Sequence, residues 1–146
     1  NGNLEDWMVP QTSYWLYDNG KVIGYGRIRH YLNDNLAETS GHVGYAIRQT
    51  ERNKGYGTKI LSLLLEECKK LNIKKVQIGA NANNIASNRI IVKNGGFLFR
   101  ATGIKNFYRI GCLHLFRHLY STSSTEKDIG AENPETTRVF AQRDKN

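Results

Sequence analysis

The sequence predicts an α+β (mixed α/β) domain, and three observations carry this prediction. Residues 12–29 alternate apolar and polar side chains with a period of two, as β-strands do. Residues 60–71 place their apolar side chains on one stripe of a 3.6-residue helix. A loop with two glycines, residues 52–58, lies before this helix. The predicted order is strand, strand, strand, helix, strand, helix, which favours helices packed on a sheet.

The first two strands are predicted to form a hairpin. In residues 12–18, Tyr14 and Leu16 share one face, and Trp15 and Tyr17 share the other. Asn19-Gly20 follows, a pair that tolerates the positive φ angles of a two-residue turn. Residues 21–29 then resume the strand pattern.

The middle of the chain contains the remaining predicted elements. We expect a polar loop at 33–40 and a third strand at 42–48. After the helix at 60–71, a short strand is predicted at 75–80. A second helix is predicted at 85–93, because two glycines follow it and glycine can close a helix in the left-handed conformation.

The C-terminal part is less regular in pattern. Residues 98–119 contain enough Phe, Tyr, Leu and Ile for one or two strands. Residues 120–146 are polar and lack an apolar period, so we expect a mobile tail there. The domain organisation predicted is one folded domain at 1–119 and the tail at 120–146.

Composition limits the class of protein. The chain has 146 residues, of which 39% are hydrophobic, and a formal net charge of +8. Such a surface attracts anions, either nucleic acid or a phosphorylated cofactor. Nucleic acid is disfavoured, because no basic run exceeds two residues. No segment is apolar enough for a membrane span, so we expect a cytoplasmic protein without membrane association. Cys68 and Cys112 are expected to be core thiols, with no metal site.

The loop Arg52-Asn53-Lys54-Gly55-Tyr56-Gly57-Thr58 has the properties of a pyrophosphate site. Glycine lets backbone N–H groups approach a ligand, and the helix that follows presents unpaired N–H donors. Arg52 and Lys54 add positive charge. The alternative is an ordinary glycine turn capped by Thr58. The third glycine of a Rossmann loop and the Gly-Lys-Ser/Thr end of a Walker loop are both missing.

Two linked motifs resemble the GNAT superfamily of N-acetyltransferases, and within it a poorly characterised bacterial acetyltransferase group. Gly44-Tyr45-Ala46-Ile47 followed by residues 52–57 is similar to that family's motif A. Asn84-Ile85-Ala86-Ser87-Asn88 followed by Lys93-Asn94-Gly95-Gly96-Phe97 is similar to its motif B. The resemblance covers roughly residues 10–97. The usual N-terminal strand and two helices have no counterpart here, so we expect the domain to be N-terminally incomplete.

The resemblance implies where acetyl-CoA binds. Strands 42–48 and 75–80 are expected to splay apart, with the pantetheine arm in the gap. Backbone groups of Ala46 and Ile47 would bond this arm, and residues 52–58 would hold the pyrophosphate. Asn84 would reach the arm, cap the following helix, or do both. Asn88 is a further candidate, and plain solvent exposure is the alternative for Asn88 and Ser87.

The resemblance also directs the search for catalytic residues. Amine attack on a thioester requires removal of a proton and stabilisation of the leaving sulfur. Candidate bases near the third strand are Glu38, His42 and Tyr45, and the alternative for His42 is a hydrogen-bonding strand residue. Many relatives place a tyrosine that protonates the sulfur in the second helix, where this chain has Ile91.

The function expected is acetyl-CoA dependent N-acetylation of a primary amine on a small molecule or peptide. The missing tyrosine and the missing N-terminal elements leave one alternative, a catalytically silent coenzyme A binding module. The sequence does not decide whether the protein forms a homodimer.

Overall fold

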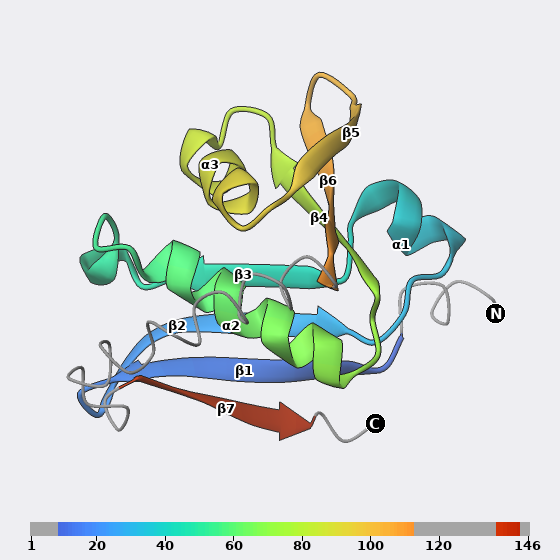
Figure 1. The fold of residues 1–146 in the computed structure, drawn as a ribbon. Coiled ribbons are helices and arrows are strands. Elements are labelled where there is room, and N and C mark those ends of the chain that lie inside the picture. Colours follow the sequence, from blue (N-terminus) through green and yellow to red (C-terminus); the bar gives the residue numbers. More distant parts are fainter. Residues whose placement is uncertain (1–8, 113–136, 144–146) are drawn as a thin grey trace, which may run out of the picture.

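Two sheets that diverge from one another organise the chain (Figure 1). The computed structural model describes residues 9–112 and 137–143. In chain order the elements are β1 (Gln11–Asp18), β2 (Lys21–Arg29), α1 (Asp34–Thr39), β3 (Val43–Ile47), the 3₁₀ turn η2 (Gln49–Glu51), α2 (Tyr56–Lys70), β4 (Lys75–Asn81), α3 (Ile85–Lys93), β5 (Phe97–Ala101), β6 (Lys105–Gly111) and β7 (Thr137–Arg143). One sheet has the order β3-β2-β1-β7 and the other β4-β6-β5. The mixed α+β class predicted from the sequence is confirmed.

The predicted hairpin is β1 and β2. Its turn residues Asn19 and Gly20 have φ angles of 50° and 74°, and Asp18 pairs with Lys21. Positive φ at both central positions matches the right-handed twist of the strands, which is why Asn-Gly is favoured there. The faces also agree with the prediction, since Leu16 is completely buried while Trp15 is partly exposed.

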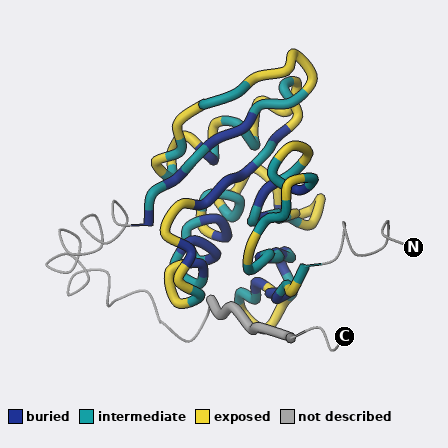
Figure 2. The backbone as a smooth tube through the Cα atoms, turned by 90° about the vertical axis from the view of Figure 1, so that its right-hand side faces the viewer, coloured by how far each residue is buried: buried dark blue, intermediate teal, exposed yellow. Residues whose placement is uncertain are grey.

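Helix α2 covers one face of the first sheet, and its apolar stripe forms the centre of the core. Ile60, Leu61, Leu64, Leu65 and Cys68 are all buried. The helix packs so closely on β2 that a Cβ atom on Gly26 would come within 2.7 Å of Leu64. The buried residues lie along the middle of the strands and on one side of α2, whereas the turns between elements are mostly exposed (Figure 2).

Two features differ from the sequence-based expectations. The polar segment 33–40 is not simply a loop, because it contains α1, which is N-capped by the Asn33 side chain at 2.9 Å from the Leu36 nitrogen. Burial of Leu36 holds this short helix on the domain. Within the expected tail at 120–146, residues 137–143 form β7, which pairs antiparallel with β1. The rest of that tail lies outside the described residues.

The start of α2 also corrects one reading of the glycine loop. The helix begins at Tyr56, and Gly55 occupies the N-cap position with a left-handed φ of 84°. Thr58, considered as a cap, therefore lies inside the first turn. Gly55 adopts the left-handed conformation, which is energetically unfavourable for a residue that has a Cβ atom.

The residue before β3, His42, is hydrogen-bonded to β4. The His42 backbone N–H donates to the Gln77 carbonyl at 2.8 Å, and the Gln77 N–H donates to the His42 ring Nδ1 at 3.0 Å. Beyond this point each strand belongs to a different sheet. The predicted splay is therefore present, and the His42–Gln77 junction is its closed end, which we call the apex. Helix α3 has the bounds expected from the sequence.

Both cysteines are buried free thiols, as expected for core residues. No helix within the described ranges is long and apolar enough to cross a membrane.

Candidate functional site

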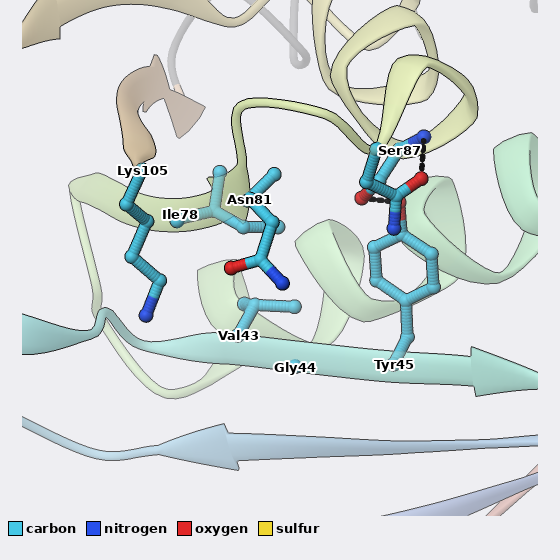
Figure 3. Close-up of a pocket in the computed structure, with 10 residues that line it drawn as sticks. Val43, Gly44, Tyr45, Ile78, Asn81, Ser87 and Lys105 are labelled. Atoms are coloured by element: carbon cyan, nitrogen blue, oxygen red, sulfur yellow. Dashed lines mark hydrogen bonds between the residues drawn. The ribbon is translucent and has the colours of Figure 1, made fainter. Parts of the chain in front are cut away.

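A cleft of about 230 Å³ lies between the diverging strands β3 and β4 (Figure 3). It is lined from β3, from the C-terminal half of β4, from the start of α3 and from the start of β6. The lining residues are Val43, Gly44, Tyr45, Ile78, Gly79, Ala80, Asn81, Asn84, Ser87 and Lys105. Since β3 and β4 do not share a ladder here, backbone edges as well as side chains face the cleft.

The glycine loop has the open backbone that an anion requires. Asn53 and Gly55 both have positive φ angles, and a Cβ atom on Gly55 would meet nothing within 4 Å. The first backbone N–H groups of α2 have no partner within the helix and carry its partial positive charge. No described residue obstructs approach to the backbone at Gly55. Gly57 has a different role, because a Cβ atom there would lie 2.5 Å from Ile90 of α3. Its small size allows α2 and α3 to pack closely.

Ion pairs to the β1–β2 turn hold this loop in place. The carboxylate of Glu51 is buried and accepts hydrogen bonds from Lys21 and, at 3.0 Å, from Lys54. These contacts, the one from Lys21 first, lower the pKa of Glu51 from 4.5 to about 2. The Tyr56 hydroxyl donates to Asp18 at 2.6 Å. This anchoring could not be predicted from the sequence, because Lys21 and Glu51 lie 30 residues apart.

The loop arginine also has a structural partner. Arg52 is exposed, and its Nε donates to the carbonyl of Ile47 at 3.2 Å. Arg52 therefore ties the end of β3 to the loop. Ala46 and Ile47 pair with β2 through one edge of β3, opposite Tyr25 and Gly24.

A pair of hydroxyl groups spans the cleft. Tyr45 extends from β3 toward α3, and its hydroxyl lies 3.0 Å from the Oγ of Ser87 (Figure 3). Burial raises the pKa of Tyr45, so the phenol stays protonated at neutral pH. A protonated phenol donates a proton rather than accepting one. A role for Ser87 beside Tyr45 could not be predicted from the sequence, because the two residues lie 42 positions apart.

Asn84 caps α3, as one of its two predicted roles requires. Its Oδ1 accepts from the backbone nitrogen of Ser87 at 3.1 Å. Asn84 also lines the cleft, and the cap uses only the oxygen of the side chain. The cap leaves the Nδ2 group of this cleft-lining residue as a hydrogen-bond donor.

Asn88 uses both ends of its amide inside the protein. Its Nδ2 donates to the carbonyls of Asn81 and Asn84, at 3.0 and 2.7 Å. Its Oδ1 accepts from Asn106 at 2.9 Å and from Tyr108 at 2.6 Å. Asn88 thereby ties α3 to β4 and β6 and does not line the cleft.

The three candidate bases do not come together. Tyr45 lines the cleft, whereas His42 lies at the apex and Glu38 lies on α1. The Nδ1 lone pair of His42 is occupied by the Gln77 N–H, and burial together with Arg29 lowers the pKa of this histidine. Glu38 is exposed, and its carboxylate lies 3.5 Å from Arg100.

Ile91 does not face the cleft. Its side chain is completely buried in the core cluster. A tyrosine in its place would enter the core, so the structure gives no reason to expect a proton donor at this position. The hydroxyl groups that do reach the cleft are those of Tyr45 and Ser87.

Comparisons with known proteins agree with this geometry. Residues 3–97 match the acetyltransferase (GNAT) family. The chain belongs to this family, and the resemblance seen in the sequence is confirmed.

Solved structures with the same fold are distant in sequence. YncA of Salmonella typhimurium, solved with its cofactor acetyl-CoA, is 21% identical with a TM-score of 0.51, and the match covers 64% of this chain and 60% of that one. The aminoglycoside acetyltransferase AAC(6')-Ib in complex with coenzyme A is 19% identical with a TM-score of 0.60, covering 74% and 69%. The spermidine/spermine N-acetyltransferase SpeG of Vibrio cholerae is 14% identical with a TM-score of 0.60, covering 80% and 76%. A comparison with curated proteins found no match.

Proposed function

We propose that this protein transfers the acetyl group of acetyl-CoA to a primary amine. The observation that carries the proposal is the juxtaposition of the β3–β4 cleft with the open loop before α2. A long, narrow cofactor with phosphates at one end and a thioester at the other fits such an arrangement. Family membership and structural neighbours that acetylate an aminoglycoside or spermidine support an amine as the acceptor.

Specific residues would hold acetyl-CoA. Backbone N–H groups from Gly55 to Thr58 would bind the pyrophosphate, and Arg52 and Lys54 would add charge-assisted contacts. The Ile47 N–H on the free edge of β3 would bond the pantetheine arm, with the Asn84 Nδ2 group as a further donor. The backbone groups of Ala46, the other expected residue, face Tyr25 of β2 in the ladder and are not free. Bound in this way, acetyl-CoA supplies an activated acyl group, a thioester, in the cleft.

We assign Tyr45 as the proton donor. As the amine nitrogen forms its bond to the acetyl carbon, the bond from that carbon to sulfur breaks, and the sulfur needs a proton or a hydrogen bond. Tyr45 is protonated, lines the cleft and is oriented by Ser87 at 3.0 Å. Tyr45 can therefore donate, which replaces its expected role as a base.

Proton removal from the amine does not use His42 in our proposal. The His42 lone pair that a base would use is bonded to the Gln77 nitrogen, so this residue holds the apex. The ten cleft residues include no carboxylate and no histidine. We therefore expect the acceptor to react from its free-amine form, with a rate that rises with pH up to the pKa of the acceptor itself. The proton that the nitrogen loses on forming the amide restores the Tyr45 hydroxyl, directly or through solvent.

Cofactor binding is tested by a thermal shift with acetyl-CoA in native protein and in Gly55→Val. A β-branched side chain at φ 84° strains the loop and obstructs the phosphate, so the shift should be lost. Gly103→Val is the matched control, because Gly103 has a φ of 88°, lies in the β5–β6 turn and has equal free space. A full shift in folded Gly55→Val would disprove the loop assignment.

Transfer is tested by the release of free thiol from acetyl-CoA in the presence of a panel of primary amines. Amine-dependent release is expected. Binding of acetyl-CoA without release for any amine would instead identify the silent binding module.

A further inference from the structure

The cleft has one charged lining residue, and it is a cation. Lys105 extends from the start of β6 toward β3 beside Asn81 (Figure 3). Its Nζ donates to the carbonyl of Thr39 at 2.8 Å. This partner is neutral, so the bond orients the ammonium group without cancelling its charge.

Two arginines of β2 contact the same segment of chain, residues 39–44. Arg29 donates from one guanidinium nitrogen to the Ser40 hydroxyl at 2.8 Å and to the Gly41 carbonyl at 2.9 Å. Arg27 lies over Gly44, its partner in the β2–β3 ladder, because a Cβ atom on Gly44 would be 3.2 Å from the Arg27 Nε. Gly44 itself lines the cleft.

These three side chains, Lys105, Arg27 and Arg29, are called the apex cations below. Their positive charge is not neutralised within the described residues, whose ion pairs include none of them. Burial and the neighbouring Arg27 lower the pKa of Arg29, as expected where like charges face each other. Helix α1 carries two acids: Glu38 is paired with a fourth cation, Arg100, and Asp34 forms no ion pair with the apex cations.

A polycationic acceptor would be repelled at such a site. Carboxylates around the acceptor site would favour binding of a polyamine or an aminoglycoside, and the cleft lining contains none. An acceptor with its own negative charge would instead be attracted, and a carboxylate or phosphate can accept hydrogen bonds from both a lysine and an arginine.

We propose that the amine acetylated here also carries an anionic group, a carboxylate or a phosphate, which Lys105 and Arg27 bind. The acceptor is thus a small zwitterionic amine rather than a polycation. This inference rests on the proposed acetyl transfer, since it identifies the acceptor of that reaction.

The test compares matched acceptors that differ only in the anion. β-Alanine is compared with β-alaninamide, and O-phosphoethanolamine with ethanolamine, with spermidine as the polycation. Thiol release gives kcat/KM for each compound. We expect the kcat/KM of at least one anionic amine, β-alanine or O-phosphoethanolamine, to exceed that of its neutral partner. Which pair shows the difference distinguishes recognition of a carboxylate from recognition of a phosphate. Spermidine should be the poorest acceptor.

Variants assign the preference to the apex cations. Lys105→Met and Arg27→Met should each lower the preference for the anionic acceptor by about 10- to 100-fold, the range for loss of a hydrogen bond to a charged group. Lys105→Arg should retain most of it. Lys75→Met is the control, because Lys75 is exposed at the opposite end of the β4–β6 ladder. The thermal shift with acetyl-CoA should stay unchanged in Arg27→Met and Lys75→Met, whose side chains do not line the cleft.

A second measurement does not depend on turnover. N-acetyl-β-alanine, its amide, N-acetyl-O-phosphoethanolamine and N-acetylethanolamine are titrated calorimetrically into protein saturated with coenzyme A. Tighter binding of an anionic compound, lost in Lys105→Met, supports the inference even if no amine releases thiol, and in that case the proposed transfer fails by itself. Equal binding of charged and neutral compounds, or spermidine as the best acceptor, would overturn the inference and leave the transfer reaction standing.

Discussion

The two ends of the cleft carry positive charge in different states. At the loop before α2, Lys21 and Lys54 share the buried carboxylate of Glu51, so part of the charge is used to fix the backbone that would receive phosphates. At the apex, Arg29 and Lys105 bond to neutral groups, and their charge remains available. The net charge of +8 alone does not distinguish these situations. A cation paired with a carboxylate stabilises the fold, whereas a cation bonded only to neutral groups can still attract an anionic ligand.

The hydroxyl pair between the two ends should show the largest effect. We expect Tyr45→Phe to lower kcat by about 10²- to 10⁴-fold, the usual contribution of a general acid, with little change in the binding of acetyl-CoA. Tyr25→Phe removes a hydroxyl that contacts Ser13 instead, and serves as the control. An unchanged kcat in Tyr45→Phe would mean that the sulfur leaves without a proton from this residue. Only the charged groups at the two ends of the cleft would then retain a proposed role.

The apex is expected to depend on an acceptor atom at His42 and not on its titration. His42→Ala leaves the Gln77 N–H without a partner and should lower the free energy of unfolding by about 1–3 kcal/mol. His42→Asn offers an amide oxygen where Nδ1 stood, and should retain most of the stability and the activity. Urea unfolding and kcat/KM provide the two measurements. Activity lost in His42→Asn at full stability would show that the histidine is the base.

The same residue predicts a pH dependence of stability. Because burial lowers the pKa of His42 below its ordinary value of 6.5, the unfolded chain binds a proton more readily than the folded one. Its contribution should therefore be complete above pH 6.5 and decline as the pH falls below that value. This decline should be absent in His42→Asn, as urea unfolding across that range would show.

Variants of Asn84 test whether its Nδ2 group donates a hydrogen bond to acetyl-CoA. Asn84→Ser keeps a good N-cap but removes the Nδ2 donor, so the stability should change little while the Kd for acetyl-CoA rises by about tenfold. Asn84→Ala removes the cap as well and should cost about 0.5–2 kcal/mol of stability. Equal affinity in native protein and Asn84→Ser would restrict Asn84 to capping.

The smallest effect on catalysis is expected from the buried carboxylate of the loop, whose contribution is to stability. Because the folded-state pKa of Glu51 is about 2, against 4.5 ordinarily, its ion pairs contribute stability above pH 4.5 that is lost as the pH falls toward 2. Glu51→Gln should remove this dependence in acid unfolding curves. If the curves of the two proteins are parallel from pH 4.5 to 2, the ion pairs do not anchor the loop.

Local patterns in the sequence determined the elements and the nature of the loop. Asn19-Gly20 specifies its turn through φ angles that few other residues adopt, and the stripe at 60–71 specifies a helix through spacing alone. Asn84 and the glycines of 52–58 likewise act on backbone within a few residues of themselves. Such signals depend only on neighbours along the chain, so they can be read without the fold.

Tertiary structure decided what each polar side chain does. The Glu51 carboxylate meets Lys21 across 30 residues, Tyr45 meets Ser87 across 42, and His42 receives the Gln77 N–H across 35. The segment 33–40 became a helix because Leu36 finds a buried site, and 137–143 became a strand because β1 offers an edge. Charge pairing and hydrogen bonding act over a few ångströms in space, and sequence separation does not report that distance.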